Sequence, residues 1–360
     1  MSHELEAVNG RVEMFSGMGL VPWHGLGTVV QGRLTAREAI VAASLEWPVG
    51  FKPITVNGIE LSMEEYRAVC RMDTGSCLGV VKGRYNLIQN LDCFDFMDSL
   101  VADGQLKYET AGALRGGKVI WLMAKYDGDL VIAGDKHDQW LLLVTSHDGS
   151  RCLECCWVTC RVVCANTLSV ALNGKKNSVK IRHSSEWKGK RNEAQRVLGL
   201  TKNYFADMKQ TLEKLQDRAM TPEDMEAFTK LLFPVKDESR GAPVPTRTSN
   251  QRWGTARLFN RPAGGTAGQT AWDGLNAVTD YADHVAPMRG QTTRLESALM
   301  GSGAELKQRA VELLTGEDFF RQIQDVRSWK PAPVVVPVAE SIPTHVQQAG
   351  LGDFDRLLGK

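Results

Sequence analysis

The chain has 360 residues, of which 43% are hydrophobic and 24% are charged, and its formal net charge is +1. These values are typical of a folded protein with one large or two ordinary domains, and they exclude polyanion binding through overall charge. No apolar run reaches the ~18 residues that span a bilayer, and the N-terminus lacks a signal-peptide layout, so we expect a cytoplasmic protein with no membrane partner.

The first part of the chain predicts an antiparallel sheet with a packed helix. Thr35 is a suitable N-cap for a helix over AREAIVAASL, and the two prolines in EWPVGFKPITV favour an edge strand. Strands follow over YRAVCRMD and CLGVVKGRYNLI, and Asn90 can cap a helix over LDCFDFMDSLVADG. Two further strands, KYETAGAL and KVIWLMAKY, are joined by RGG, which indicates a hairpin.

Residues 127–183 add strands over LVIAG, QWLLLVTSH, a cysteine-rich segment and SVKIRHS, with a short helix over TLSVAL capped by Asn166. Five of the eight cysteines lie here, namely Cys152, Cys155, Cys156, Cys160 and Cys164. Their single Cys-x-x-Cys pair lacks the second pair of a zinc ribbon, and cytoplasmic cysteines are normally thiols. We therefore interpret them as packed structural thiols and not as a metal or redox site.

From Trp187 the pattern becomes helical, with a helix over RNEAQRVLGLTKNYFADMKQTLEKLQ and another that begins at Thr221-Pro222. The stretch VKDESRGAPVPTRTSNQ has no periodicity and is interpreted as a loop or a disordered insert. The predicted organisation is a sheet-and-helix core over 1–186, a helical region over 187–330 with a flexible insert near 234–252, and a Pro-rich tail over 331–360. The short apolar and acidic motif that ends this tail suits docking in a partner groove.

Positive charge is concentrated at the join between the two halves. Residues 175–196 hold eight lysines and arginines against two glutamates, a balance of 8 − 2 = +6 in a nearly neutral chain. Strand alternation would place Lys180 and Arg182 on one side, where they can follow a phosphate backbone. The alternative is a solvated charge run between two domains.

Aromatic residues adjoin cations in the first half, where Tyr85 follows Arg84, Tyr108 follows Lys107, and Arg115 and Lys118 flank the RGG turn. Stacking a base on an exposed aromatic contributes ~1–3 kcal/mol whatever the sequence. The alternative is that both tyrosines are half-buried strand residues. The candidate DNA-binding residues are therefore Lys82, Arg84, Tyr85, Lys107, Tyr108, Arg115, Lys118, Arg161, Lys175, Lys176, Lys180, Arg182, Lys188, Lys190 and Arg191.

Histidines and aspartates offer a second interpretation. His24 in PWHGLG has no evident catalytic partner, and a structural hydrogen bond is the simpler role. A metal site would draw its ligands from a larger set, namely His24, His147, Asp148, Asp280, Asp283 and His284. The glycine-rich GGTAGQTAWDG lacks the lysine of a phosphate loop, so nucleotide hydrolysis is not expected. We predict no metal and no cofactor.

The motifs PWHGLG, RYNLIQN, KYETAGAL, SHDGS, RVVCANTL, KIRHS and TAWDGLNAVTDYADH resemble, in this order, a phage- and plasmid-borne family of unknown function. The order of strand, helix and hairpin also resembles phage single-strand annealing proteins of the RecT and ERF type. That resemblance implies a curved antiparallel sheet packed on a helix, in subunits that assemble into rings or filaments around single-stranded DNA. The expected fold class is thus α+β, a curved antiparallel sheet with a packed helix followed by a mostly helical C-terminal half.

The functional hypothesis is a mobile-element protein that binds and anneals single-stranded DNA as a homo-oligomer, without nucleotide hydrolysis. Its tail would dock on a host or phage replication protein. A metal-dependent enzyme acting on nucleic acid or nucleotides is the first alternative. An anti-defence protein that binds a host factor is the second.

Overall fold

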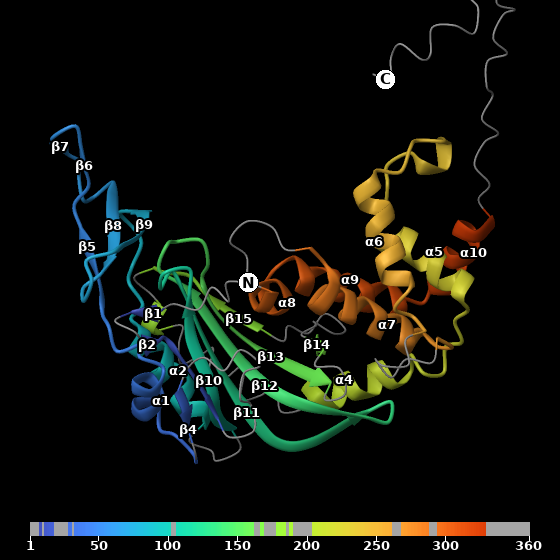
Figure 1. Cartoon of the computed structure of the whole chain (residues 1–360), viewed down its shortest axis with the longest axis horizontal. Helices are drawn as coiled ribbons and strands as arrows, with labels where there is room; N and C mark the ends of the chain where they lie inside the picture. Colours follow the sequence, from blue (N-terminus) through green and yellow to red (C-terminus); the bar gives the residue numbers. More distant parts are fainter. Residues whose placement is uncertain are drawn as a thin grey trace, which may run out of the picture.

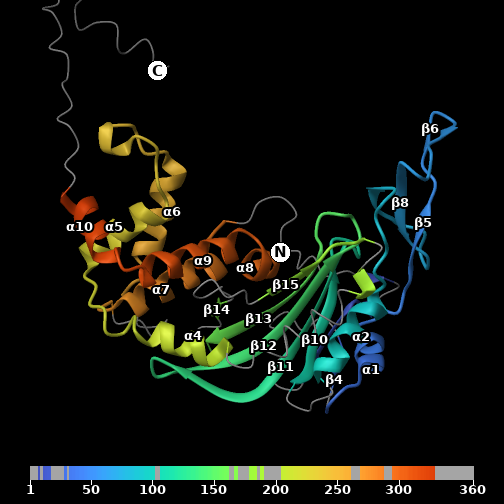
Figure 2. The same ribbon diagram turned by 180° about the vertical axis from the view of Figure 1, so that it is seen from behind.

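The computed structural model describes residues 7–8, 11–17, 28–30, 32–101, 106–161, 166–168, 178–184, 187–189, 204–260, 268–287 and 294–328. An antiparallel sheet forms the centre of the molecule, and helices pack on both of its faces. Two arms rise from opposite ends of the sheet, so that the molecule is an open crescent (Figures 1 and 2).

The central sheet is curved and not closed, as Figure 1 shows. Its strands are β3 (Met14–Gly17), β4 (Thr28–Val30), β10 (Leu106–Leu114), β11 (Val119–Ile132), β12 (Asp135–Ser146), β13 (Leu153–Arg161), β14 (Asn166–Leu168) and β15 (Ser178–Ile181). The order is β14-β13-β12-β11-β10-β3-β4, and β15 also pairs with β13. Every pairing is antiparallel except that of β3 with β4. The predicted antiparallel α+β fold is confirmed.

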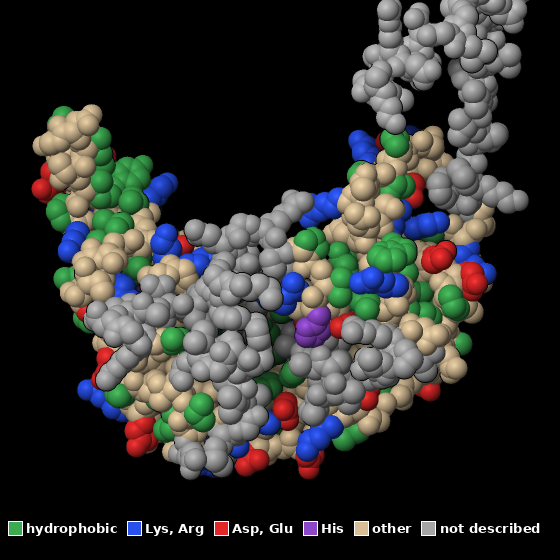
Figure 3. Space-filling view, in the orientation of Figure 1, with side chains coloured by type: hydrophobic (Ala, Val, Ile, Leu, Met, Phe, Trp, Pro, Cys, Tyr) green, Lys and Arg blue, Asp and Glu red, His purple; other side chains and the backbone are tan. Residues whose placement is uncertain are grey.

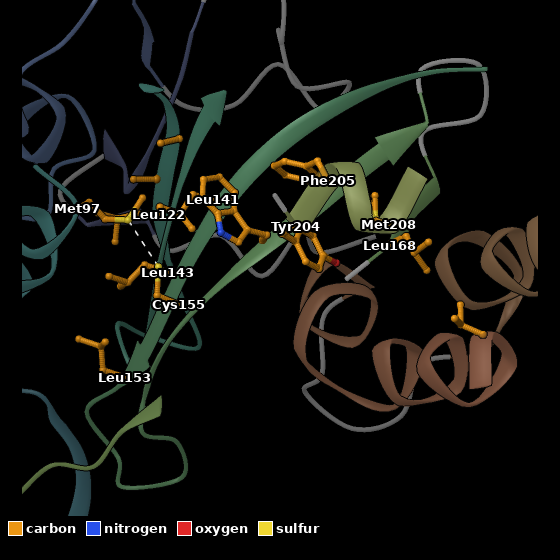
Figure 4. Close-up of a cluster of buried hydrophobic side chains, with 14 of the residues drawn as sticks. Met97, Leu122, Leu141, Leu143, Leu153, Cys155, Leu168, Tyr204, Phe205 and Met208 are labelled. Atoms are coloured by element: carbon orange, nitrogen blue, oxygen red, sulfur yellow. Dashed lines mark hydrogen bonds between the residues drawn. The ribbon is translucent and has the colours of Figure 1, made fainter. Parts of the chain in front are cut away.

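Helices α1 (Ala36–Ala42), α2 (Asn90–Val101) and α4 (Tyr204–Glu213) cover one face of this sheet. The predicted N-cap of α1 is confirmed, because Thr35 and Glu38 form a reciprocal capping box. In the core shown in Figure 4, Phe205 of α4 packs against the sheet near Leu141, and Met97 of α2 packs near Cys155.

The cysteine-rich segment forms strand β13, and its side chains alternate between the two faces of the sheet. Cys155 is buried among apolar side chains with its sulfur 3.9 Å from that of Met97, and this burial raises its pKa. Cys156 is buried on the opposite face. The interpretation as packed thiols is therefore confirmed for these two residues, whereas Cys152 and Cys160 are half-buried and Cys164 lies outside the described residues.

The other face of the sheet is covered by α8 (Arg294–Met300), whose Leu299 packs near Trp140. The rest of the helical half consists of α5 (Pro222–Leu232), a 3-10 turn (Glu238–Arg240), α6 (Thr246–Ala256), α7 (Ala271–Asp280), a π-helical turn (Tyr281–Val285), α9 (Ser302–Thr315) and α10 (Phe319–Ser328). The predicted start of α5 is confirmed, because Thr221 caps it and Pro222 occupies its first turn. Buried side chains form one continuous core from the sheet into these helices.

A small sheet forms the arm at the N-terminal end. Its strands are β5 (Val49–Lys52), β8 (Tyr66–Arg71) and β9 (Cys77–Lys82), in the order β5-β8-β9, and a hairpin of β6 (Thr55–Val56) and β7 (Ile59–Glu60) extends it. The edge position predicted for β5 is confirmed. A two-stranded ladder of β1 (Ala7–Val8) and β2 (Arg11–Val12) lies at the base of the arm (Figure 1).

A buried ion pair joins this arm to the central sheet. The guanidinium of Arg71 lies 2.8 Å from the carboxylate of Glu13 and 2.8 Å from that of Asp73, and it also packs over the ring of Trp47. Arg71 and Glu13 are both only 2% exposed. The small sheet is therefore fixed to the base of the crescent by a paired charge and not by apolar contact alone.

Two local predictions were wrong. Asn166 does not cap a helix but begins strand β14, because residues 166–168 pair with 159–161 of β13. Part of the predicted loop near 234–252 is helical, since α6 covers Thr246–Ala256. Its Arg252 donates to the carbonyl of Phe233 and pairs with Glu238 at 2.6 Å. These tertiary contacts hold the helix in place, although its sequence has no apolar periodicity.

Among the residues that the structure describes, no helix combines the length and the apolar character needed to cross a bilayer.

Candidate nucleic-acid interface

Three segments that are distant in the sequence meet where the small sheet joins the central sheet. Residues 84–90 follow β9, residues 145–150 end β12 and begin the next turn, and residues 180–184 end β15 and follow it. They contain RYNLIQN, SHDGS and KIRHS, three of the motifs that carry the family resemblance. We call this meeting point the junction.

The contact at the centre of the junction is an aromatic stack. The rings of Tyr85 and His183 lie parallel, with centroids 4.5 Å apart and an angle of 9°. The hydroxyl of Tyr85 donates to the carbonyl of Ser146 at 2.9 Å, which attaches the third segment. Burial raises the pKa of Tyr85, so its hydroxyl remains a donor at neutral pH.

Backbone contacts fix the two segments on either side of this stack. The N–H of Asn86 donates to the carbonyl of His183 at 3.1 Å, and the Asn86 carbonyl lies 3.1 Å from Nδ1 of the same histidine. The guanidinium of Arg67 donates to the carbonyls of Gly83 and Tyr85, which flank Arg84. Gly79 of β9 lies so close to the turn that a Cβ atom there would be 2.6 Å from the Cα of Asp148.

Both junction histidines are buried and neutral. Nε2 of His147 lies 2.8 Å from Oδ1 of Asn90, and Nε2 of His183 lies 3.0 Å from the hydroxyl of Thr145. Burial lowers the pKa of His147 to about 3 and that of His183 to about 4. These rings are therefore suited to holding the junction together and not to exchanging protons at neutral pH.

Cations surround this buried frame. Lys82, Arg84, Arg182 and Lys188 are exposed and Lys118 is half-buried, and none of the five makes an ion pair with a carboxylate in the described part of the chain. We call these five residues the junction patch. Arg84 and Arg182 each precede a member of the Tyr85–His183 stack, so the two arginines are carried by segments that contact each other.

Acidic side chains also lie near the junction. Burial opposes ionisation of Asp148, but hydrogen bonds from Ser150 and Ser146 and the charge of Lys118 hold its pKa below the usual value. Glu64 and Glu65 are exposed, and their backbones contact Gly83. The patch therefore remains cationic, but less strongly than the five positive charges alone would suggest.

Three other predicted cations are neutralised by carboxylates. Lys107 pairs with Glu109 at 3.1 Å, and Lys180 pairs with Glu154 of the adjacent strand at 3.1 Å. Arg115 pairs at 2.7 Å with Glu296 of α8, a carboxylate that is only 1% exposed. Arg115 therefore fixes α8 to the sheet, and the prediction that it offers its charge to a ligand is corrected.

The interpretation of Tyr108 as a stacking platform is also corrected. Its ring is only 2% exposed, and its hydroxyl donates to the carbonyl of Phe94 in α2 at 3.0 Å. The alternation of β10 directs this side chain into the core, as the alternative interpretation of a strand residue required.

Some predicted residues lie outside the described part of the chain. They are Lys175, Lys176, Lys190 and Arg191 of the basic stretch and His24 of PWHGLG. The backbone of Arg161 ends β13, and its side chain is not described.

The candidate metal ligands are not gathered in the described part of the chain, where no group of three potential ligands occurs. His147 lies in the junction, whereas Asp280 and His284 lie at the end of α7 and in the π-helical turn. Asp283 pairs with the buried amine of Lys307 at 2.7 Å, which gives it a structural role. The shared helical face predicted for Asp280 and His284 is altered by the π-helical turn.

Several residues that build the junction were not singled out from the sequence. They are Arg67, Asn86, Thr145, Ser146 and His183, all of which act through contacts with other segments. Asn86, Ser146 and His183 lie within the family motifs, whereas Arg67 and Thr145 lie outside them.

A family model described as "Domain of unknown function (DUF932)" matches residues 77–300. No curated protein and no solved structure matches the chain. The matched region includes β9, the three junction segments and strands β10 to β15 of the central sheet, and it ends with α8, whereas β3 and β4 lie outside it.

Proposed function

Because this chain belongs to that family of unknown function, we propose its activity from the junction patch: it binds single-stranded DNA and anneals complementary strands without nucleotide hydrolysis. Exposed cations without carboxylate partners neutralise phosphates, and this term dominates sequence-independent affinity for nucleic acid. The proposal thus rests on local charge, in a chain whose total charge is only +1.

One observation supports this proposal above the others, namely that Arg84 and Arg182 lie on two segments that are joined to each other. Their segments are linked by a hydrogen bond between residues 97 positions apart, His183 and Asn86. The Tyr85–His183 stack and the Arg67 hydrogen bonds hold the backbone on both sides of Arg84. Cations on a fixed frame lose less conformational entropy when a phosphate binds than cations on a loop do.

Annealing follows from how such a surface would hold a strand. Contacts to the phosphate backbone position a strand but do not read its sequence. The base edges then remain available for pairing with a complementary strand. A surface of this kind needs no bond-making residue, and the neutral, hydrogen-bonded histidines of the junction are consistent with that role.

Self-assembly and a mobile-element setting belong to the same proposal. In the described part of the chain β5 and β9 have no further strand partner, and the small sheet exposes three large apolar side chains, Tyr66, Met72 and Val80. A second copy of the chain that covers this sheet would extend the cationic surface from one subunit to the next. Docking of a replication protein would involve residues 331–360, which lie outside the described part of the chain. Size-exclusion chromatography with and without an oligonucleotide tests the assembly.

The binding proposal is tested by charge reversal with a matched control. The double variant R84E/R182E alters the junction patch, and K209E/R321E alters the half-buried Lys209 and the exposed Arg321, which make local pairs on α4 and α10. Each double variant changes the net charge from +1 to 1 − 4 = −3. Fluorescence anisotropy with a labelled oligonucleotide of about 30 nucleotides covers the site sizes expected for single-strand binding.

We expect R84E/R182E to lose at least about tenfold in affinity, which corresponds to about 1.4 kcal/mol, while K209E/R321E stays within about threefold of the wild type. The rate of annealing two complementary oligonucleotides should fall in parallel with affinity. Equal affinities for the two double variants would contradict the proposal.

A further inference from the structure

The second arm of the crescent carries an exposed tryptophan that the junction does not involve. Trp253 of α6 is 64% exposed, although tryptophan is usually one of the more buried residues. The guanidinium carbon of Arg257 lies 4.7 Å from the centroid of its ring, in a cation–π contact. Helix α6 therefore presents an aromatic surface and a cation together.

The sequence around this helix has no acidic residue. From Ser239 to Trp272 there are five arginines and neither aspartate nor glutamate. Arg247 and Arg257 are exposed and make no ion pair with a described carboxylate. Trp253 therefore shares α6 and its C-terminal end with two cations that have no described carboxylate partner, while Glu238 at the base of the helix is paired with Arg252.

The helix is held firmly at its base, so that the tryptophan is not on a free loop. Arg252 is 9% exposed and makes a bidentate pair with Glu238, with distances of 2.7 and 2.6 Å. Gly254 faces the ring of Tyr281, where an added Cβ would lie 3.0 Å from the ring edge. The residues on either side of Trp253 thus pack inward, which leaves its own ring outward.

We propose that α6 is a second contact for single-stranded nucleic acid, in which Trp253 stacks on a base while Arg247 and Arg257 contact the neighbouring phosphates. This inference rests on the proposed function, because it assigns a second site to the same ligand. Cations without carboxylate partners complement a phosphate backbone, and every base offers a face for stacking. A groove for a protein partner would be expected to surround the tryptophan with further apolar side chains.

The position of α6 indicates that one strand contacts both sites. Figure 1 places α6 on the arm opposite the small sheet, with α8 and α9 between them. In the space-filling view of Figure 3, the upper face is hollowed between the two arms, and Lys and Arg side chains lie on both of its rims. A strand crossing this hollow would meet the junction patch at one end and Trp253 at the other.

Oligonucleotide length separates the two contacts. We compare wild type, W253A, R84E/R182E and F320A with oligonucleotides from about 6 to about 40 nucleotides, a range that brackets known single-strand site sizes. Phe320 is a matched control, because it is an aromatic residue on α10 of the same arm and is 49% exposed. The variant W253F keeps an aromatic ring, so it tests whether binding depends on the aromatic character of residue 253.

We expect W253A to bind the shortest oligonucleotides as the wild type does and to bind the longest about 5- to 100-fold more weakly, which corresponds to ~1–3 kcal/mol for one stacked base. W253F should lose less, and F320A should lose nothing at any length.

Wild-type affinity of W253A at every length, with R84E/R182E impaired, would overturn this inference and leave the proposed function intact. If W253A lost the same affinity at every oligonucleotide length, the claim that one strand contacts both sites would be overturned. No binding by the wild type would overturn the proposed function itself. Loss of a protein partner by W253A with unchanged binding to DNA would show a protein-docking surface and overturn the inference.

Discussion

The rings of Tyr85 and His183 are stacked: their centroids are 4.5 Å apart, and their planes differ by 9°. This stack joins the segment that contains Arg84 to the segment that contains Arg182. The backbone hydrogen bond from Asn86 to His183, and the contact of the His183 ring nitrogen with the Asn86 carbonyl, fix the position of one segment relative to the other. The exposed cations of the junction therefore depend on a buried aromatic pair for their relative position.

Two substitutions of Tyr85 distinguish the contribution of the ring stack to stability from that of the hydroxyl hydrogen bond. Y85F keeps the ring and loses the hydrogen bond to Ser146, at a cost of about 1 kcal/mol in the free energy of unfolding. Y85L also loses the aromatic contact, and we expect a total loss of about 2–3 kcal/mol. Urea unfolding measures both values. Y85L should bind an oligonucleotide more weakly than Y85F under conditions in which both are folded, and equal binding would show that the stack does not position the cations.

The buried histidines make stability depend on pH. Their pKa values, about 3 for His147 and about 4 for His183, lie below the ordinary value of 6.5 that applies in the unfolded chain. Below pH 6.5 the unfolded state therefore binds more protons than the folded state, so stability falls as pH falls. Between pH 6.5 and 5.5 we expect a loss of about 1 kcal/mol for each histidine. Urea unfolding across this range measures the slope.

The variant H183N serves as the control for this prediction. It removes one of the two titrating groups, so its unfolding free energy should be lower than that of the wild type at neutral pH but should change about half as much between pH 6.5 and 5.5. An unchanged slope in H183N would mean that the pKa of His183 is not depressed in the folded protein.

Because Arg71 and Glu13 form a buried ion pair, we expect a single substitution there to lower the free energy of unfolding strongly. R71M leaves the Glu13 carboxylate buried without its principal cation, which typically costs 3–5 kcal/mol, about the whole stability of a marginal domain. R33M is the matched control, because Arg33 pairs with Asp127 at the surface, with 57% and 67% of the two side chains exposed, and such pairs contribute less than about 1 kcal/mol. Similar unfolding midpoints for R71M and R33M would contradict this account.

Local signals predicted much of the fold correctly. Capping residues identified the starts of α1 and α5, and the RGG turn identified the hairpin of β10 and β11. Each of these signals acts within a few residues, so a sequence reader can recognise it. Strand β14 and helix α6 could not be recognised in this way. β14 forms by pairing with residues 159–161 of β13, and α6 is held by the pair of Arg252 with Glu238, and neither contact has a local sequence signal.

The same distinction separates the predicted site residues. Arg84 and Arg182 were selected because they are cationic, and nothing in the sequence opposed that choice. Arg115 was selected for the same reason, but its partner Glu296 is 181 positions away in the sequence. Long-range neutralisation of this kind leaves no local pattern, so charge counting along the chain overestimates the number of available cations.

The dependence of binding on salt tests the central claim most directly. Each phosphate contact made to a single strand contributes a slope of about −0.7 to the plot of log affinity against log salt concentration. We predict that R84A/R182A reduces the slope by about 1.4 relative to the wild type, whereas K209A/R321A leaves it unchanged. A wild-type slope near zero, or identical slopes for the two double variants, would contradict the assignment of the junction patch to nucleic acid.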